Sequence, residues 1–161
     1  MKLSAKILLS AAVVLTASAM FAAPAKKHTP SRAQRSEPYR IVNDYKEAQR
    51  ISERTRKPIM IIFSGSDWCG WCVKLDNEVF SKKEFQNWAK DHLVVYLADF
   101  PRSKKIPPAQ KAQNDQLARK YRIQGFPTVL LVNAKGDVIA RTGYRRGGPA
   151  KYVQHLKQYV R

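Results

Sequence analysis

The sequence predicts a single α/β domain in which helices flank a mixed central sheet. Apolar runs of strand length alternate with stretches in which apolar residues recur at helical spacing. The last two apolar runs are separated by Lys135-Gly136-Asp137, a turn sequence that predicts a hairpin of antiparallel strands. The expected order of elements is therefore α-β-α-α-β-α-β-β-α, which combines helix-linked strands with a terminal hairpin.

The first half of the domain opens with a helix. Apolar residues recur at helical spacing over 43–56, and Pro58 ends this helix. The continuous apolar run 59–63 is typical of a central strand buried on both faces. The other elements expected here are a loop at 64–68, a helix from near 69 toward 80, a helix at 83–90 and a strand at 93–97.

The second half begins with an irregular basic loop over 101–108. Gly125-Phe126-Pro127 interrupts the chain before the apolar run 128–132, which predicts a strand. Apolar residues at helical spacing predict a closing helix over 150–160. The remaining expected elements are a helix at 114–121 and a strand at 138–141.

Residues 1–23 have the pattern of a secretory signal peptide. Lys2 and Lys6 precede an uncharged apolar run over 7–17, and small residues follow it, with cleavage expected between Ala19 and Ala23. The apolar run is too short to span a bilayer comfortably, which makes a retained membrane anchor the lesser alternative. We therefore expect export to the periplasm.

The next segment separates this leader from the domain. Residues 24–38 are rich in Pro, Lys, Arg, Ser and Gln and have almost no large apolar side chain, so we interpret them as a flexible linker. Residues 39–161 have the length of one small domain with its own core.

The formal net charge of +18 attracts anionic partners. Nucleic acid is one candidate, because Lys and Arg neutralise phosphates. A basic, soluble surface without a nucleic-acid partner is the alternative, and the expected export favours it. The basic clusters at 102–105 and 141–146 leave contact with anionic lipid or an acidic partner open.

Both cysteines of the chain lie in one C-x-x-C motif, Cys69 to Cys72. Zinc requires two more ligands, but there is no third cysteine and the three histidines are isolated in sequence. Covalent haem requires a histidine after the second cysteine, where Val73 stands. We therefore expect a redox-active pair that needs no metal and no cofactor.

The position of the motif favours redox chemistry. Cys69 follows a buried strand and opens a helix, where free backbone N–H groups and the helix dipole stabilise a thiolate. Cys72 lies one turn later on the same face, within disulfide range. We predict that Cys69 attacks the client and that Cys72 resolves the mixed disulfide.

Residues 67–72, Asp-Trp-Cys-Gly-Trp-Cys, and residues 125–128, Gly-Phe-Pro-Thr, resemble the thioredoxin superfamily over 39–161. The resemblance implies the thioredoxin fold and thiol-disulfide exchange. Within the superfamily, further motifs are most similar to periplasmic oxidoreductases of the Dsb group, including the C-terminal domains of the DsbD family. These motifs are 65–69, 99–101 and 143–148.

The resemblance also implies roles for residues around the dithiol. Pro127 corresponds to a cis-proline that faces the dithiol and aligns an extended client, whereas an ordinary trans turn proline is the alternative. Trp68 and Trp71 flank the cysteines as an apolar client-binding lip, with Phe126 grouped beside them. Simple packing of Trp68 on the domain is compatible with this role.

One departure from thioredoxins concerns the catalytic acid. Thioredoxins have a buried acid on the strand before the dithiol, but 59–63 contains none. Asp76, four residues beyond Cys72 on the same helical face, is a substitute, as in domains of the DsbD type. The alternatives are a solvated surface role for Asp76 and a loop or cap role for Asp67.

Three hypotheses of function follow. The first is a protein-disulfide reductase for exported clients that is recharged by a membrane electron donor of the DsbD type. The second is an oxidase or isomerase with the same dithiol, and the third is a basic binding module in which the dithiol is incidental. The Gly70-Trp71 dipeptide lacks the histidine that stabilises the thiolate of strong oxidants, which favours the reductase.

Overall fold

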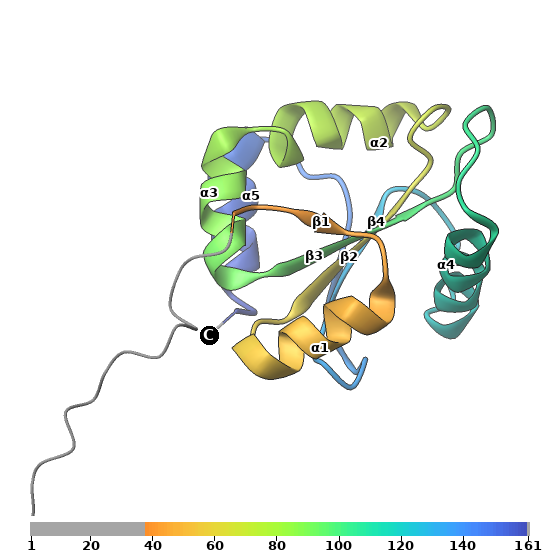
Figure 1. Ribbon diagram of the computed structural model, residues 1–161. Helices are drawn as coiled ribbons and strands as arrows, with labels where there is room; N and C mark the ends of the chain where they lie inside the picture. Colours follow the sequence, from red (N-terminus) through yellow and green to blue (C-terminus); the bar gives the residue numbers. More distant parts are fainter. Residues whose placement is uncertain (1–37, 161) are drawn as a thin grey trace, which may run out of the picture. The chain divides into compact units, whose positions relative to one another are not determined.

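The protein was analysed as a computed structural model, which describes residues 38–160 (Figure 1). The expected signal peptide and all but the last residue of the expected linker lie outside the described residues. None of the helices in the described part of the chain is long and apolar enough to cross a membrane.

The centre of the domain is a five-stranded sheet in the order β1-β3-β2-β4-β5. β1, β3 and β2 run parallel to one another, whereas β4 is antiparallel to both β2 and β5. The strands are β1 (Ile41–Val42), β2 (Ile59–Ser64), β3 (Val94–Asp99), β4 (Thr128–Val132) and β5 (Val138–Thr142). This arrangement confirms the predicted mixed sheet and terminal hairpin.

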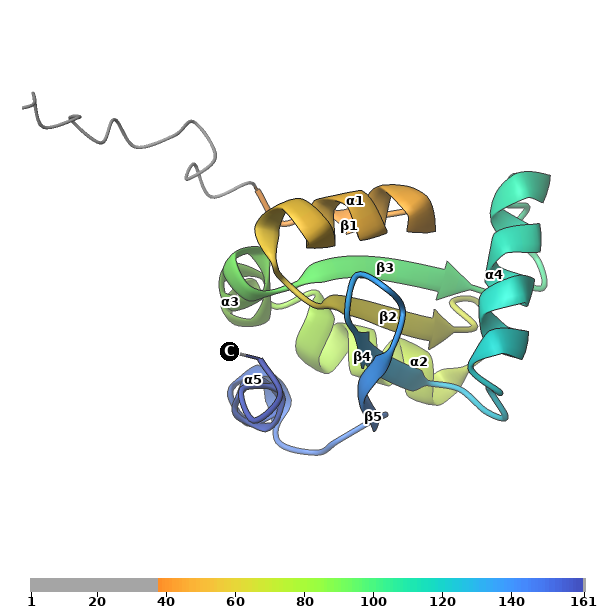
Figure 2. The same cartoon turned by 90° about the horizontal axis from the view of Figure 1, so that it is seen from below.

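Helices cover both faces of the sheet, with α1 opposite α2 (Figures 1 and 2). Met60 and Ile62 of β2 pack into a core with α2, α3 and α5. The alternate residues Ile59, Ile61 and Phe63 pack into a second core with α1 and α4. β2 is buried along its whole length, as expected for a central strand covered on both faces. The helical segments are α1 (Tyr45–Thr55), α2 (Gly70–Leu75), the π-helical η2 (Asp76–Phe80), α3 (Lys83–His92), α4 (Pro108–Lys120) and α5 (Gly148–Leu156).

Several element boundaries differ from the predictions. β1 has only two residues and was not predicted. α4 begins at Pro108 rather than 114, because proline is well accommodated in the first turn of a helix and the next residues are too polar to show an apolar period. α5 begins at Gly148 and ends at Leu156, so the predicted helix over 150–160 is shifted toward the N-terminus.

The parallel pairing of β2 with β3 positions the functional loops. Ser64 lies opposite Asp99 in the register, so both strands end side by side and the loops that follow them are neighbours. Asn114 of α4 fixes this end of the sheet, because its Nδ2 donates to the Asp99 carbonyl at 2.9 Å and its Oδ1 accepts from the Tyr96 hydroxyl. Asn114 is fully buried.

We predict that Asn114→Ala destabilises the domain by about 1–3 kcal/mol, because it removes the donor to the part-buried Asp99 carbonyl and the acceptor of the buried Tyr96 hydroxyl. Urea denaturation measures the effect. Gln116→Ala, an exposed position on the same helix, is the matched control and stays close to wild type. Equal unfolding free energies for the two variants would contradict a stabilising role for the Asn114 contacts.

Candidate active site

The two cysteines lie where the loop after β2 enters α2. Cys69 is the N-cap of α2, and its sulfur forms a disulfide with Cys72, whose Cα atom is 5.2 Å away. The backbone N–H of Cys72 also donates to Cys69 Sγ at 3.2 Å. The helix start therefore presents an N–H donor to Cys69, which is the interaction that stabilises a thiolate.

Two carboxylates fix the loop that carries Cys69. Asp99 at the end of β3 accepts the N–H of Ser66 at 2.9 Å and the Ser66 hydroxyl at 2.6 Å. In the opposite direction, Asp67 accepts three N–H groups, at 2.7 to 3.1 Å, from residues 102–104 of the loop after β3. These backbone bonds, led by that from Arg102, hold the pKa of the Asp67 carboxyl below its ordinary value.

Trp68 is packed on the domain and also exposed beside the dithiol. Its Nε1 donates to the Phe100 carbonyl at 2.7 Å, and its ring meets the Phe126 ring edge-on at 5.7 Å. Gly65 makes room for the indole, since a Cβ there would lie 2.4 Å from the ring. The side chain is still 38% exposed, so packing on the domain leaves part of the indole at the surface.

Trp71 lies between the two cysteines in sequence and is 54% exposed. Its ring is 5.0 Å from that of Tyr144, whose hydroxyl donates to Glu78 at 2.7 Å. Sequence reasoning noted Tyr144 only within the 143–148 motif and did not place it at the site. The 143–148 motif contained Tyr144, but a local pattern could not show its contact with Trp71. The two residues are 73 positions apart in sequence, and only the fold brings them together.

The Phe126–Pro127 peptide bond is cis. Pro127 lines a cavity of about 340 Å³ together with Cys72 and Asp76, whereas Cys69 is not part of its lining. The structure thus brings the predicted Pro127 and Asp76 to the second cysteine. Ser64, Ser66 and Leu97 complete the polar and apolar walls around them.

Asp76 is an exposed residue that also lines this cavity. Desolvation raises the pKa of its carboxyl above the ordinary value. Burial, and secondarily the charge of Asp76, raises the pKa of Tyr39 to about 12. The acid at the cavity is therefore easier to protonate than an ordinary aspartate.

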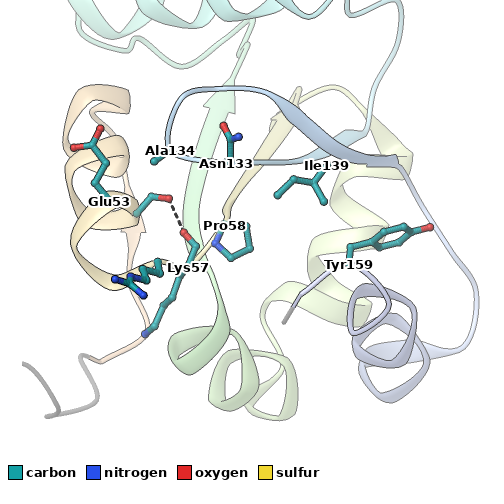
Figure 3. Close-up of a pocket in the computed structure, with 9 residues that line it drawn as sticks. Glu53, Lys57, Pro58, Asn133, Ala134, Ile139 and Tyr159 are labelled. Atoms are coloured by element: carbon teal, nitrogen blue, oxygen red, sulfur yellow. Dashed lines mark hydrogen bonds between the residues drawn. The ribbon is translucent and has the colours of Figure 1, made fainter.

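A second cavity, of about 450 Å³, lies at the opposite end of β2 (Figure 3). It is lined by Pro58 before that strand, by Asn133 after β4, and by Tyr159 near the C-terminus. Ser52 donates to the Lys57 carbonyl at 2.6 Å beside it. The lining contains no cysteine and no histidine, so this cavity takes no part in dithiol chemistry. Within residues 38–160, no cluster of three His, Cys, Asp or Glu side chains is arranged to hold a metal ion.

A disulfide-forming C-x-x-C at a helix start, near a cis-proline and on a mixed sheet, defines a thioredoxin-fold protein of thiol-disulfide exchange. The thioredoxin-like domain family matches residues 45–159. The chain therefore belongs to this family, as the sequence motifs predicted.

Similarity to individual proteins shows which members of the thioredoxin-like family this chain resembles. The disulfide bond reductase DsbH of Chlamydia pneumoniae is 37% identical over 117 residues, which cover 73% of this chain and 70% of that protein. A solved structure of a DsbH oxidoreductase is 35% identical with a TM-score of 0.70, covering 78% of this chain and 90% of that one. The thiol:disulfide interchange protein DsbD of Photorhabdus laumondii is 29% identical over 108 residues, which are 66% of this chain but 17% of that protein. The chain is a thiol-disulfide oxidoreductase similar to DsbH.

We predict that Asp67→Asn weakens the link between the two loops and lowers stability at neutral pH. Because the folded-state pKa of Asp67 is depressed, its carboxylate stabilises the fold above the unfolded pKa of about 3.9, and this contribution is lost as pH falls through the folded value. Urea denaturation of wild type and variant from pH 7 downward should show the difference in stability shrinking in acid. A difference that is constant with pH would contradict an ionised Asp67 as the cause.

Proposed function

We propose that the protein reduces disulfides of exported client proteins through the Cys69/Cys72 dithiol. The observation that carries this proposal is the disulfide that these residues form at the start of α2, where Cys69 receives an N–H donor. The similarity to a disulfide bond reductase over most of both chains supports the direction. The histidine-free Gly70-Trp71 dipeptide supports it as well.

The reaction begins with the reduced dithiol. The Cys69 thiolate attacks one sulfur of the client disulfide, and the second client sulfur leaves as a thiolate. Cys72 then attacks Cys69 Sγ, which breaks the mixed disulfide and releases the other client sulfur. The client gains two electrons and two protons in all, and the protein is left with the Cys69–Cys72 disulfide.

Asp76 is proposed to accept the proton of Cys72 in the second step. Both residues line the same cavity, and the raised pKa of the Asp76 carboxyl makes its carboxylate a stronger base than an ordinary aspartate. Pro127 lines the cavity too, and its proposed role is to align the extended client beside the dithiol. Trp68, Trp71 and Phe126 are proposed to contact the client on either side.

Export and recharging complete the proposal. The charged and apolar pattern of residues 1–23 supports export to the periplasm by a cleaved signal peptide, with 24–38 as the linker to the domain. Each turnover leaves the dithiol oxidised, so a donor of two electrons must restore it. We propose a membrane donor of the DsbD type, and no nucleic-acid, metal or cofactor partner is part of the scheme.

Insulin reduction by wild type, Cys69→Ser and Cys72→Ala tests the function. We expect turnover by wild type only. On non-reducing gels Cys72→Ala should accumulate mixed disulfides, because Cys69 still attacks and nothing resolves the product, whereas Cys69→Ser should not. Equal trapping by both variants would contradict the assigned order of attack, and absence of turnover by wild type would contradict the enzyme itself.

The direction is tested by equilibrating the pair with glutathione. The expected reduction potential lies nearer the roughly −270 mV of thioredoxin than the roughly −120 mV of a strong oxidase. A value at the oxidase end, together with oxidation of reduced clients, would move the assignment to disulfide formation.

We predict that Asp76→Asn slows release of reduced client from the mixed disulfide by up to about 100-fold, because the proton acceptor for Cys72 is lost. In wild type the rate should fall as pH drops through the raised pKa of Asp76, and the variant should lack this step. Rapid-mixing kinetics across pH measure both effects. Asp91→Asn, an exposed acid on α3, is the control. Identical pH profiles for Asp76→Asn and wild type would return Asp76 to a surface role.

A further inference from the structure

Aromatic rings and cations lie together on the surface around the dithiol, which we call the rim. Its residues are Trp68, Trp71, Tyr144, Arg102 and Lys74. Besides the two exposed tryptophans, the guanidinium of Arg102 lies 4.1 Å from the centre of the Trp68 ring. Lys74 Nζ is 5.4 Å from the Trp71 ring and 5.6 Å from the Tyr144 ring. Positive charge is therefore held against both exposed tryptophans beside the cysteines.

Two acids near this rim are engaged within the loops, and a third, Glu78, accepts from the Tyr144 hydroxyl at 2.7 Å. Asp67 accepts three backbone N–H groups and Asp99 is held by Ser66. Among the ion pairs of residues 38–160 none involves Arg102, and the pair of Lys74 with Glu78 is long, at 3.8 Å, between two exposed side chains. The cations of the rim consequently remain available to a bound partner.

Further cations extend the charge along both loops. Lys104 and Lys105 are exposed beyond Arg102. Arg145 and Arg146 are exposed next to Tyr144 in sequence, and the charge of Arg146 acts on the Tyr144 hydroxyl. A client that contacts Trp68 and Trp71 thus meets positive charge beside each ring.

We propose that this rim selects client segments with acidic residues on both sides of the target disulfide. The proposal rests on the proposed function, because the cations surround the reacting sulfurs. The chosen occupant is an acidic polypeptide rather than lipid or nucleic acid, since the exposed rings suit side-chain contact and the dithiol acts on a protein disulfide. Docking by charge complementarity would speed encounter and favour such clients over basic ones.

Binding is tested without the reaction. The probes are two labelled peptides that each contain one S-methylated cysteine. They are identical except that Glu flanks the cysteine in one and Lys flanks it in the other. Fluorescence anisotropy with the oxidised protein should show the Glu peptide binding at least about fivefold tighter at low salt. The difference should shrink as salt is raised, because the contacts are exposed. Equal affinity for the two peptides would overturn the proposal.

A matched pair of double variants locates the effect. Arg102→Gln with Lys104→Gln should reduce the preference to within about twofold. Lys135→Gln with Lys157→Gln removes the same charge at two exposed sites, one in the turn before β5 and one at the end of α5, and should retain the preference. An equal loss of preference in both double variants would assign the preference to net charge and overturn a rim-specific site. Tighter binding of single-stranded DNA or anionic vesicles than of the Glu peptide would overturn the choice of an acidic polypeptide.

Reduction of peptides with the same two sequences but an unmethylated cysteine, each held in a disulfide, separates this proposal from the function. Charge-selective binding without reduction would contradict the reductase and leave the docking surface standing. Reduction of both peptides with equal kcat/KM and equal affinity would contradict the docking surface and leave the reductase standing.

Discussion

Two carboxylates determine the geometry of the dithiol, because each of two neighbouring loop regions provides one that hydrogen-bonds the other. Asp99 at the end of β3 holds Ser66 in the loop after β2, and Asp67 from that loop holds the backbone of 102–104. This reciprocal bonding is possible because the two strands are parallel and end in register. It satisfies backbone N–H groups that the irregular loops would otherwise leave unpaired, and it fixes the chain just before it enters α2 at Cys69.

The hydrogen bonds of Asp99 and Asp67 also determine which charges are free near the cysteines. They use the nearby acids to bind backbone and leave Arg102 free to lie against Trp68. Positive charge and the Cys72 N–H both favour a thiolate at Cys69, which stabilises the reduced dithiol and raises its potential. The absence of a histidine from Gly70-Trp71 omits one further stabilising contact. The potential reflects these opposing contributions, and the electron donor determines the net direction.

The sequence predicted local features well and long-range contacts poorly. The strand at 128–132 was predicted to the residue, because a continuous apolar run bounded by a Pro-containing break and a turn admits few other structures. The position of Cys69 at a helix start followed from the run before it. No local pattern encodes the hydrogen bonds of Asp67 to a loop 35 positions away, or the contact of Arg102 with Trp68. β1 has two residues, too few to show any period.

The two cysteines face different surroundings, and this separates the two halves of the reaction. Cys72 lines the cavity with Asp76 and Pro127, while Cys69 lies outside that lining, between the exposed Trp68 and Trp71 in sequence. α2 changes to the π-helical η2 at Asp76, yet the acid still lies one turn after Cys72 and reaches the cavity. Under the proposed function, client contact belongs to the aromatic and cationic rim, and proton transfer belongs to the cavity that Cys72 and Asp76 line. A substitution at the rim should therefore alter which clients bind, and one in the cavity should alter how fast the mixed disulfide is resolved.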